Sequence, residues 1–142
     1  MKSIVTGGAG FIGSNLIDKL LDLGHEIVVL DNLSTGRIEN LAHVLDQIKI
    51  VECDLSMKGD WVKEFKEADW VFHLASLADI VPSIQNPESY FRSNVDATFY
   101  VLEAARHAAV KRFIYSASSS CYGIPDKYPT TEESDIRPQY PY

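Results

Sequence analysis

The chain has 142 residues, of which 46% are hydrophobic and 23% charged, a composition typical of one globular domain and not of a disordered segment. Its 20 acidic and 13 basic residues give a formal net charge of -7, so a nucleic-acid partner is not expected, because a phosphate backbone would be repelled. No apolar run reaches the ~20 residues of a membrane span, and the opening apolar stretch is too short for a signal peptide, which favours a cytoplasmic protein with no membrane partner.

Strand and helix signals alternate along the chain. Short β-prone, apolar runs predict strands over 3–6, 26–30, 48–51, 70–74 and 111–116. Between them, apolar spacing predicts a first helix that ends near Gly24, and shorter helices over 38–45 and 61–65. This alternation predicts an α/β fold, with a parallel sheet of about five strands and helices on both faces.

A longer helix is predicted over 87–109. Apolar or small residues recur there at intervals of three and four, in the stripe Phe91, Val95, Thr98, Leu102, Ala105 and Ala109. Asn86 followed by Pro87 is typical of an N-cap and a first helical position. From Gly123 onward, prolines punctuate a polar stretch that we expect to be a loop.

Glycines open the first helix at the spacing G-x-x-G-x-x-G, as Gly7, Gly10 and Gly13. The run follows a strand and precedes a helix, which is the context that a dinucleotide-binding Rossmann fold requires. There the helix N-terminus presents free N–H groups to phosphates. An ordinary glycine-rich turn is the alternative, and no G-K-[ST] follows that would indicate a P-loop.

The second predicted strand ends at Asp31, eighteen residues after Gly13. A Rossmann fold places there the carboxylate that hydrogen-bonds the adenosine ribose. Such a carboxylate would repel a 2′-phosphate, which favours NAD over NADP. The alternative is a turn residue at a strand end. Because strand, glycine loop, helix, strand and aspartate follow in register, we favour the cofactor interpretation.

Other strand ends carry weaker signals. Asp54-Leu55 follows the third strand, and could either reach an adenine or form a surface turn. His73 precedes small residues that would let a cofactor ring approach, although a histidine in a strand is more often packed than catalytic. The serines from Ser116 to Ser120 indicate either a polar turn or the wall of a sugar pocket. Cys53 and Cys121 fit no metal-binding spacing, so no metal is expected, and reduced cysteines are favoured over a disulfide.

Together these stretches resemble the extended short-chain dehydrogenase/reductase family, in its nucleotide-sugar epimerase and dehydratase branch. The resemblance covers the whole chain and is carried by T-G-G-A-G-F-I-G-S (6–14), D-N-L-S-T-G (31–36), H-L-A (73–75), N-P (86–87), N-V (94–95), S-x-S-S-S-x-Y-G (116–123) and P-Y (141–142). The second motif is most like UDP-glucose 4-epimerases, and the serine-rich motif is like UDP-N-acetylglucosamine 4-epimerases. The sugar therefore stays open.

The resemblance implies where NAD would bind. The pyrophosphate would lie against Gly7, Gly10, Phe11 and Ile12. The adenosine ribose would lie among Asp31, Asn32, Ser34, Thr35 and Gly36, and the adenine beside Asp54 and Leu55. The nicotinamide half would lie near Leu74, Ala75, Ser76, Asn94, Ser116 and Tyr142.

The resemblance also implies a reaction, NAD-dependent epimerisation at C4 of a UDP-sugar through a transient 4-keto intermediate. Ser118 matches the catalytic serine, and Tyr142 matches the tyrosine that removes the proton from the 4-hydroxyl. Dehydratases carry an acid and a base directly after that serine, and decarboxylases usually carry the glutamate. This chain has Ser119 and Ser120 there, which favours an epimerase over a dehydratase or decarboxylase.

The family's lysine, four residues after the tyrosine, falls beyond residue 142. We therefore expect residues 1–142 to be the NAD-binding Rossmann domain of a longer enzyme, truncated at its catalytic tyrosine and without the C-terminal substrate domain. Such a fragment is expected to be inactive and to bind NAD weakly. A catalytically inactive NAD-binding or regulatory module is the alternative. The full-length protein would be a homodimer, in part through the helix over 87–109.

Overall fold

The computed structural model describes residues 1–142 and contains one parallel sheet of five strands in the order β3-β2-β1-β4-β5. The strands are β1 (Lys2–Thr6), β2 (Glu26–Asp31), β3 (Ile48–Glu52), β4 (Trp70–His73) and β5 (Arg112–Tyr115). Every neighbouring pair is parallel. The predicted Rossmann-type fold is confirmed, and the strand order reverses between β1 and β4, where open α/β sheets bind ligands.

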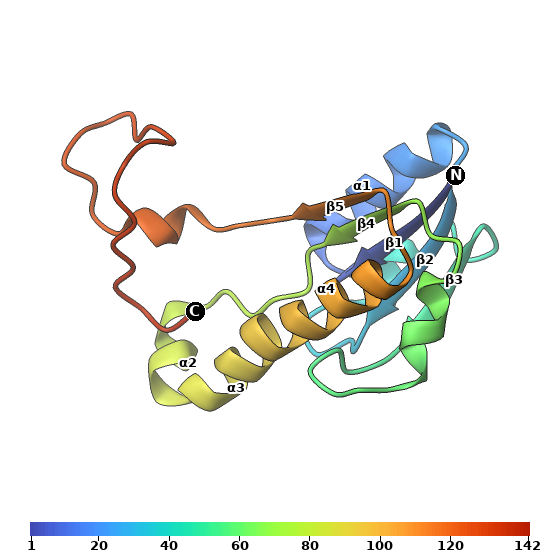
Figure 1. Cartoon of the computed structure of the whole chain (residues 1–142), viewed down its shortest axis with the longest axis horizontal. Helices are drawn as coiled ribbons and strands as arrows, with labels where there is room; N and C mark the ends of the chain where they lie inside the picture. The colour runs from blue at the N-terminus through green and yellow to red at the C-terminus, as the bar shows by residue number, and fades with distance from the viewer.

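Helices cover both faces of the sheet (Figure 1). The helix α1 (Phe11–Asp22) packs on one face, where Ile17 and Leu20 meet Val5 and Val29. On the other face, α4 (Ala97–His107) places Val101 in a second cluster of buried side chains. Neighbouring residues of β1 therefore point into different cores, which is why the central strands read as continuous apolar runs.

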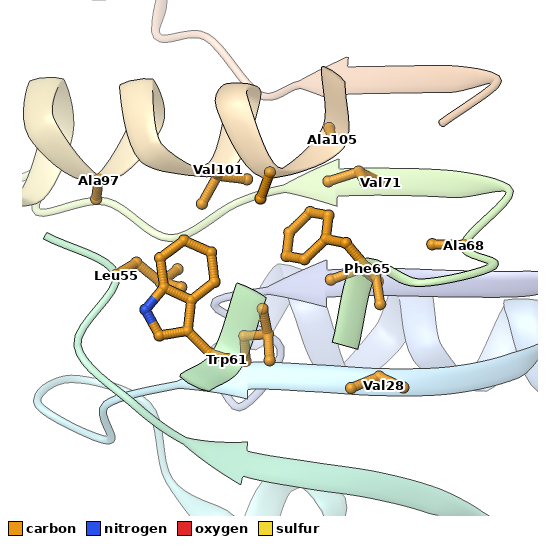
Figure 2. Packing of buried hydrophobic residues seen from close by; sticks show 12 residues of the cluster. Val28, Leu55, Trp61, Phe65, Ala68, Val71, Ala97, Val101 and Ala105 are labelled. Carbon is orange, nitrogen blue, oxygen red and sulfur yellow. The ribbon is translucent and has the colours of Figure 1, made fainter. Parts of the chain in front are cut away.

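The 3₁₀ helix η2 (Asp60–Phe65) covers the second core and places its side chains between α4 and the sheet. Figure 2 shows Trp61 and Phe65 between α4 and the strands, with Val28 and Val71 on the sheet side. A helical turn was predicted at this place. The helix predicted over 38–45 is shorter, because only η1 (Ile38–Leu41), also 3₁₀, forms before a series of turns.

The helix predicted over 87–109 consists of three joined segments, α3 (Pro87–Phe91), a π turn η3 (Arg92–Asp96) and α4. Its predicted N-cap is confirmed, since the Asn86 side chain accepts a hydrogen bond from the Ser89 N–H. No helix was predicted at α2 (Ile80–Gln85). Pro82 stands in its first turn, where the missing N–H costs nothing because no intrahelical acceptor is available.

The predicted apolar stripe of that helix is mostly exposed, and Ala105 is its one buried member. Phe91, Val95 and Leu102 are 57%, 49% and 44% exposed, while α4 buries Val101 and three alanines. A π turn adds a residue to the helical repeat, so the exposed apolar residues are Phe91, Val95, Phe99 and Leu102, with Phe99 where the predicted stripe has Thr98. The alanines Ala97, Ala104 and Ala105 let the helix approach the sheet closely.

After β5 the chain leaves the sheet and forms the extended segment seen in Figure 1. It contains one element, the 3₁₀ helix η4 (Ser119–Tyr122), and no strand or helix follows it. The loop predicted from Gly123 onward is confirmed. None of the helices has the length and apolar character needed to cross a lipid bilayer.

Candidate active site

A pocket of about 510 Å³ lies at the carboxyl ends of the strands. All five strand-end loops contribute to it, so the topology alone gathers residues that are far apart in the sequence. The sequence-predicted residues that line it are Gly7, Gly10, Phe11, Ile12, Asp31, Asn32, Ser34, Thr35, Gly36, Asp54, Leu55, Leu74, Ala75, Ser76, Ser116 and Ser118. Asn94 and Tyr142 do not line it.

The glycine loop is shaped by two close approaches of backbone to backbone. Gly7 has φ +67°, and a Cβ there would lie 2.7 Å from the Ala75 nitrogen. A Cβ on Gly13 would clash with the Gly7 carbonyl oxygen. Gly10 caps α1 without any side chain. The first N–H groups of α1 therefore remain available for an anion at the pocket.

Asp31 is buried and joins two loops. Its Oδ2 accepts a hydrogen bond from the Ala9 N–H at 2.9 Å, and its Oδ1 accepts one from the Leu33 N–H at 2.8 Å. A Cβ on Gly36 would lie 3.0 Å from Oδ2 and 2.9 Å from the Ala9 Cβ, so the loop after β2 folds back over the glycine loop. The carboxylate thus braces the pocket wall that it also lines.

Asp54 forms a turn and lines the pocket as well. Its Oδ1 accepts hydrogen bonds from the Ser56 N–H and hydroxyl, at 2.9 and 2.7 Å. The preceding Cys53 is also at the pocket, a contact that sequence reasoning missed. Burial, with the charges of Asp31 and Asp54, raises the pKa of the Cys53 thiol to about 11, so it is uncharged at neutral pH.

The loop after β4 is held from two sides. The Leu74 and Ala75 N–H groups donate to Thr6 Oγ1, both at 3.1 Å. Asn94 holds the same loop further on, because its side chain accepts from the Leu77 N–H and donates to the Leu77 carbonyl. The amide of Asn94 is therefore occupied by protein backbone. His73 is buried, with its ring between two threonine hydroxyls.

Sequence reasoning missed several lining residues, namely Leu77, Ala78, Ser93, Ala97, Ala117, Cys53 and Gly13 as a wall residue. Leu77 and Ala78 simply continue the predicted wall 74–76, so extending that prediction along the loop would have included them. Ser93 and Ala97 lie four residues apart around the π turn. Only the spacing of small residues on one helix face indicates them.

The two predicted catalytic residues reach the serine cluster differently. Ser118 lines the pocket and caps η4, accepting a hydrogen bond from the Ser120 N–H at 3.2 Å. The Tyr142 hydroxyl is hydrogen-bonded to the Ser120 hydroxyl. The structure therefore brings Tyr142 to the cluster, but its direct partner is Ser120 and not Ser118.

Comparison with known proteins matches residues 3–142 to the NAD dependent epimerase/dehydratase family. UDP-glucose 4-epimerase of Mycolicibacterium smegmatis is 41% identical over 148 residues, which are 100% of this chain and 47% of that protein. UDP-glucuronic acid decarboxylase 1 of Arabidopsis thaliana is 37% identical over 133 residues, 93% of this chain and 29% of that protein.

Solved structures give the same picture. UDP-N-acetylglucosamine 4-epimerase from Methanobrevibacter ruminantium M1, in complex with UDP-N-acetylmuramic acid, superposes with a TM-score of 0.93 at 38% identity, over 99% of this chain and 45% of that one. The UDP-glucose 4-epimerase complex with NAD from Thermus thermophilus has a TM-score of 0.90 at 36% identity, over 100% and 46%. The chain spans less than half the length of these proteins.

Proposed function

The chain belongs to the NAD dependent epimerase/dehydratase family, and on that premise we propose that it is the NAD-binding part of an enzyme that epimerises a UDP-sugar at C4. The observation that carries the proposal is the pocket at the switch point of the sheet. One wall of it holds the bare amino terminus of α1 and Asp31, and another holds Ser118. The phosphates and the reacting sugar would therefore meet the same cavity.

The residues of the pocket fit NAD. A pyrophosphate needs close backbone approach, and the glycine loop leaves no room for any Cβ at Gly7 or Gly13. Asp31 still has lone pairs beyond the two bonds it accepts, and these suit the hydroxyls of an adenosine ribose. Its negative charge would disfavour a 2′-phosphate, so NAD is preferred to NADP. Bound NAD would supply the hydride acceptor and donor.

The chain's own chemistry would lie in its hydroxyl groups. Tyr142, as a phenolate, would remove the proton from the sugar 4-hydroxyl, and Ser118 would hydrogen-bond that oxygen. A free tyrosine has a pKa of about 10, so it needs a nearby positive charge to act as a base near neutral pH. We propose that the encoded protein continues past residue 142 with a lysine as the fourth residue after Tyr142, together with a substrate-binding domain.

A dehydratase or decarboxylase of the same family is the second candidate, favoured by the similarity to the plant decarboxylase. Either activity would need a further acid or base beside the catalytic serine. This chain has only the hydroxyls of Ser119 and Ser120 there, which exchange protons poorly near neutral pH. An epimerase needs no such group, and we therefore prefer it.

We also propose a homodimer in the cytoplasm. The outward side of α3, η3 and α4 carries Phe91, Val95, Phe99 and Leu102, each between 44% and 58% exposed. An apolar stripe of this kind is typical of a subunit interface. The free cysteines Cys53 and Cys121 suit a reducing compartment.

Cofactor binding tests the first half of the proposal. Calorimetric titration of residues 1–142 with NAD, NADP and ADP-ribose should give binding of NAD and ADP-ribose, with NADP weaker. No heat with either NAD or ADP-ribose at millimolar concentration would remove the cofactor assignment. Preference for NADP would reverse the role given to Asp31.

The reaction is tested on the protein as its gene encodes it. Reading the coding sequence past codon 142 should reveal the lysine. That protein should interconvert UDP-glucose and UDP-galactose, or their N-acetylated counterparts, and Tyr142→Phe should abolish this while the protein stays folded. A stop codon after Tyr142 would favour a nucleotide-binding module without this chemistry.

A further inference from the structure

The proposed function gives no task to His73, although it is among the largest fully buried side chains of the structure, at 1% exposure. It ends β4 directly before the pocket wall formed by Leu74–Ala78. Its ring packs against Phe113 and Tyr115 of the neighbouring strand. Both of its ring nitrogens are hydrogen-bonded.

The hydrogen-bond pattern fixes which nitrogen carries the proton. A threonine hydroxyl has two acceptor lone pairs and one proton to donate. Thr6 Oγ1 accepts a hydrogen bond from the Ala75 N–H at 3.1 Å and shares the Leu74 N–H with the Thr6 carbonyl oxygen, at 3.1 and 3.2 Å, so both lone pairs face N–H donors. The 2.7 Å contact with His73 Nδ1 is therefore the Thr6 hydroxyl donating to an unprotonated Nδ1.

The other side of the ring agrees with this assignment. Nε2 then carries the proton of a neutral ring and donates to Thr98 Oγ1 at 2.9 Å. The Thr98 hydroxyl donates onward to the Asn94 carbonyl at 2.6 Å. Each side-chain donor from Thr6 through His73 to Thr98 therefore meets one acceptor, in a line that ends at the Asn94 carbonyl. Burial lowers the pKa of His73 to about 4, which keeps the ring uncharged at neutral pH.

The hydrogen bonds that run from Thr6 through His73 and Thr98 end at Asn94, which itself binds the pocket wall. The side-chain amide of Asn94, in the π turn η3, accepts from the Leu77 N–H at 2.8 Å and donates to the Leu77 carbonyl at 2.9 Å. The pocket wall is thus hydrogen-bonded to Thr6 at its start and to Asn94 three residues later. His73 and Thr98 connect Thr6 to Asn94 through further hydrogen bonds.

We propose that His73 is a positioning residue, which as a neutral imidazole protonated on Nε2 holds the Leu74–Ala78 wall in the shape that receives the nicotinamide half of the cofactor. The identity of the cofactor rests on the proposed function. The hold of Thr6, His73, Thr98 and Asn94 on the pocket wall, here called the clamp, rests on hydrogen bonds alone. Its two parts are tested by separate experiments.

The tautomer is tested without any cofactor. In ¹⁵N spectra of histidine-labelled protein at pH 7, the His73 signals should show a protonated Nε2 and an unprotonated Nδ1 that accepts a hydrogen bond. A protonated Nδ1, or a charged ring at that pH, would overturn the clamp.

Amide hydrogen exchange tests what the clamp holds. His73→Phe keeps a ring of similar size but removes both hydrogen bonds, and the matched control is His25→Phe. His25 is also buried and bonded to a hydroxyl, Ser3 at 2.8 Å, but before β2 and away from the pocket. Exchange at Leu74, Ala75 and Leu77 should become about tenfold faster in the first variant than in the control.

NAD binding then connects the clamp to function. His73→Phe should weaken NAD about tenfold relative to His25→Phe, and His73→Asn, which retains an acceptor for Thr6, should recover part of the loss. Equal NAD affinity in all variants would overturn the positioning role. Absence of NAD binding by the unmodified chain would overturn the proposed function instead, and would leave the spectroscopic and exchange results to decide on the clamp. If His73→Phe does not fold, the ¹⁵N spectra and His73→Asn still decide.

Discussion

The glycine-loop side of the pocket and the serine-cluster side are built in opposite ways. On the first side, the sheet and helices of residues 2–115 close around two buried clusters, and Asp31, Thr6 and Asn94 tie one loop to the next. On the second side, no residue after 115 is buried, and the segment stands away from the sheet in Figure 1. Half of the site is therefore fixed by the fold, and half by a few polar contacts.

The two sides of the pocket therefore differ in what holds their residues in place. The backbone positions of the glycine loop are set by the sheet and α1, and under the proposed function these positions receive the cofactor. The residues predicted to be catalytic, Ser118 and Tyr142, stand on a segment with few anchors. Among them are the Ser118 cap, the bond from the Ser116 N–H to the His73 carbonyl, and the bond from the Arg137 N–H to the Cys121 carbonyl. Substitutions should thus cost stability on the first side and leave it unchanged on the second.

The largest effect is expected for Gly7→Ala. The added Cβ would meet the Ala75 backbone at 2.7 Å in addition to the strain of φ +67°, for a loss of about 3–4 kcal/mol in unfolding free energy. NAD binding should be lost with it. Urea denaturation and calorimetry measure the two losses.

Gly24→Ala is the matched control for strain without a clash. Gly24 has φ +76° with nothing within 4 Å of an added Cβ, so only about 1 kcal/mol should be lost, with NAD binding unchanged. Equal losses for the two variants would mean that the close approach to Ala75 contributes nothing.

A smaller effect is expected for Asp31→Asn. The amide has one acceptor oxygen, so either the buried N–H of Ala9 or the part-buried N–H of Leu33 loses its partner, at about 1–3 kcal/mol. The preference for NAD over NADP should shrink at the same time, because the charge is gone. Parallel titrations with both cofactors check this, and an unchanged ratio would separate Asp31 from the ribose.

The comparison also explains what the sequence could predict. The five strands, the glycine loop and the strand-end aspartate were predictable because each is a local pattern, and the parallel sheet then brings all strand ends to one edge. The roles given to those residues in cofactor binding stay predictions. The π turn η3 inside the helix predicted over 87–109 was not predicted, because nothing in the sequence marks it.

The sequence also did not predict which side chains and loops are hydrogen-bonded to each other. Asn94 was assigned to the nicotinamide half from resemblance, but its amide holds Leu77, a contact across 17 residues that no local spacing indicates. Likewise Tyr142 is hydrogen-bonded to Ser120, two residues from Ser118, and no partner for Tyr142 was predicted. Such pairings depend on how loops pack, and periodicity carries no information about that.

Acidification should weaken the glycine-loop side through His73. Burial lowers its pKa from 6.5 to about 4, so between these values the unfolded chain binds a proton that the folded chain does not. The contribution of this pKa difference to the unfolding free energy is fully present above pH 6.5 and is lost as the pH falls toward 4. Between pH 7 and pH 5 the loss should be about 2 kcal/mol.

Urea denaturation at several pH values measures this loss, and His73→Asn should flatten the curve over the same window. The groups in contact with the ring are two threonine hydroxyls and two aromatic rings, none of which titrates there. An unchanged slope in the variant would assign the acid sensitivity to other groups.

The smallest effect is expected for Arg137→Ala, in the segment that follows β5. Arg137 pairs with Asp126 and lowers the pKa of that carboxyl through the hydrogen bond between them, yet both side chains are largely exposed, at 48% and 76%. Exposed ion pairs contribute little to stability. The melting temperature and the NAD affinity should therefore match those of the unmodified chain, while exchange of the amides between Gly123 and Arg137 accelerates. A clear drop in melting temperature would show that this segment supports the sheet, and the contrast between the two sides of the pocket would then fail.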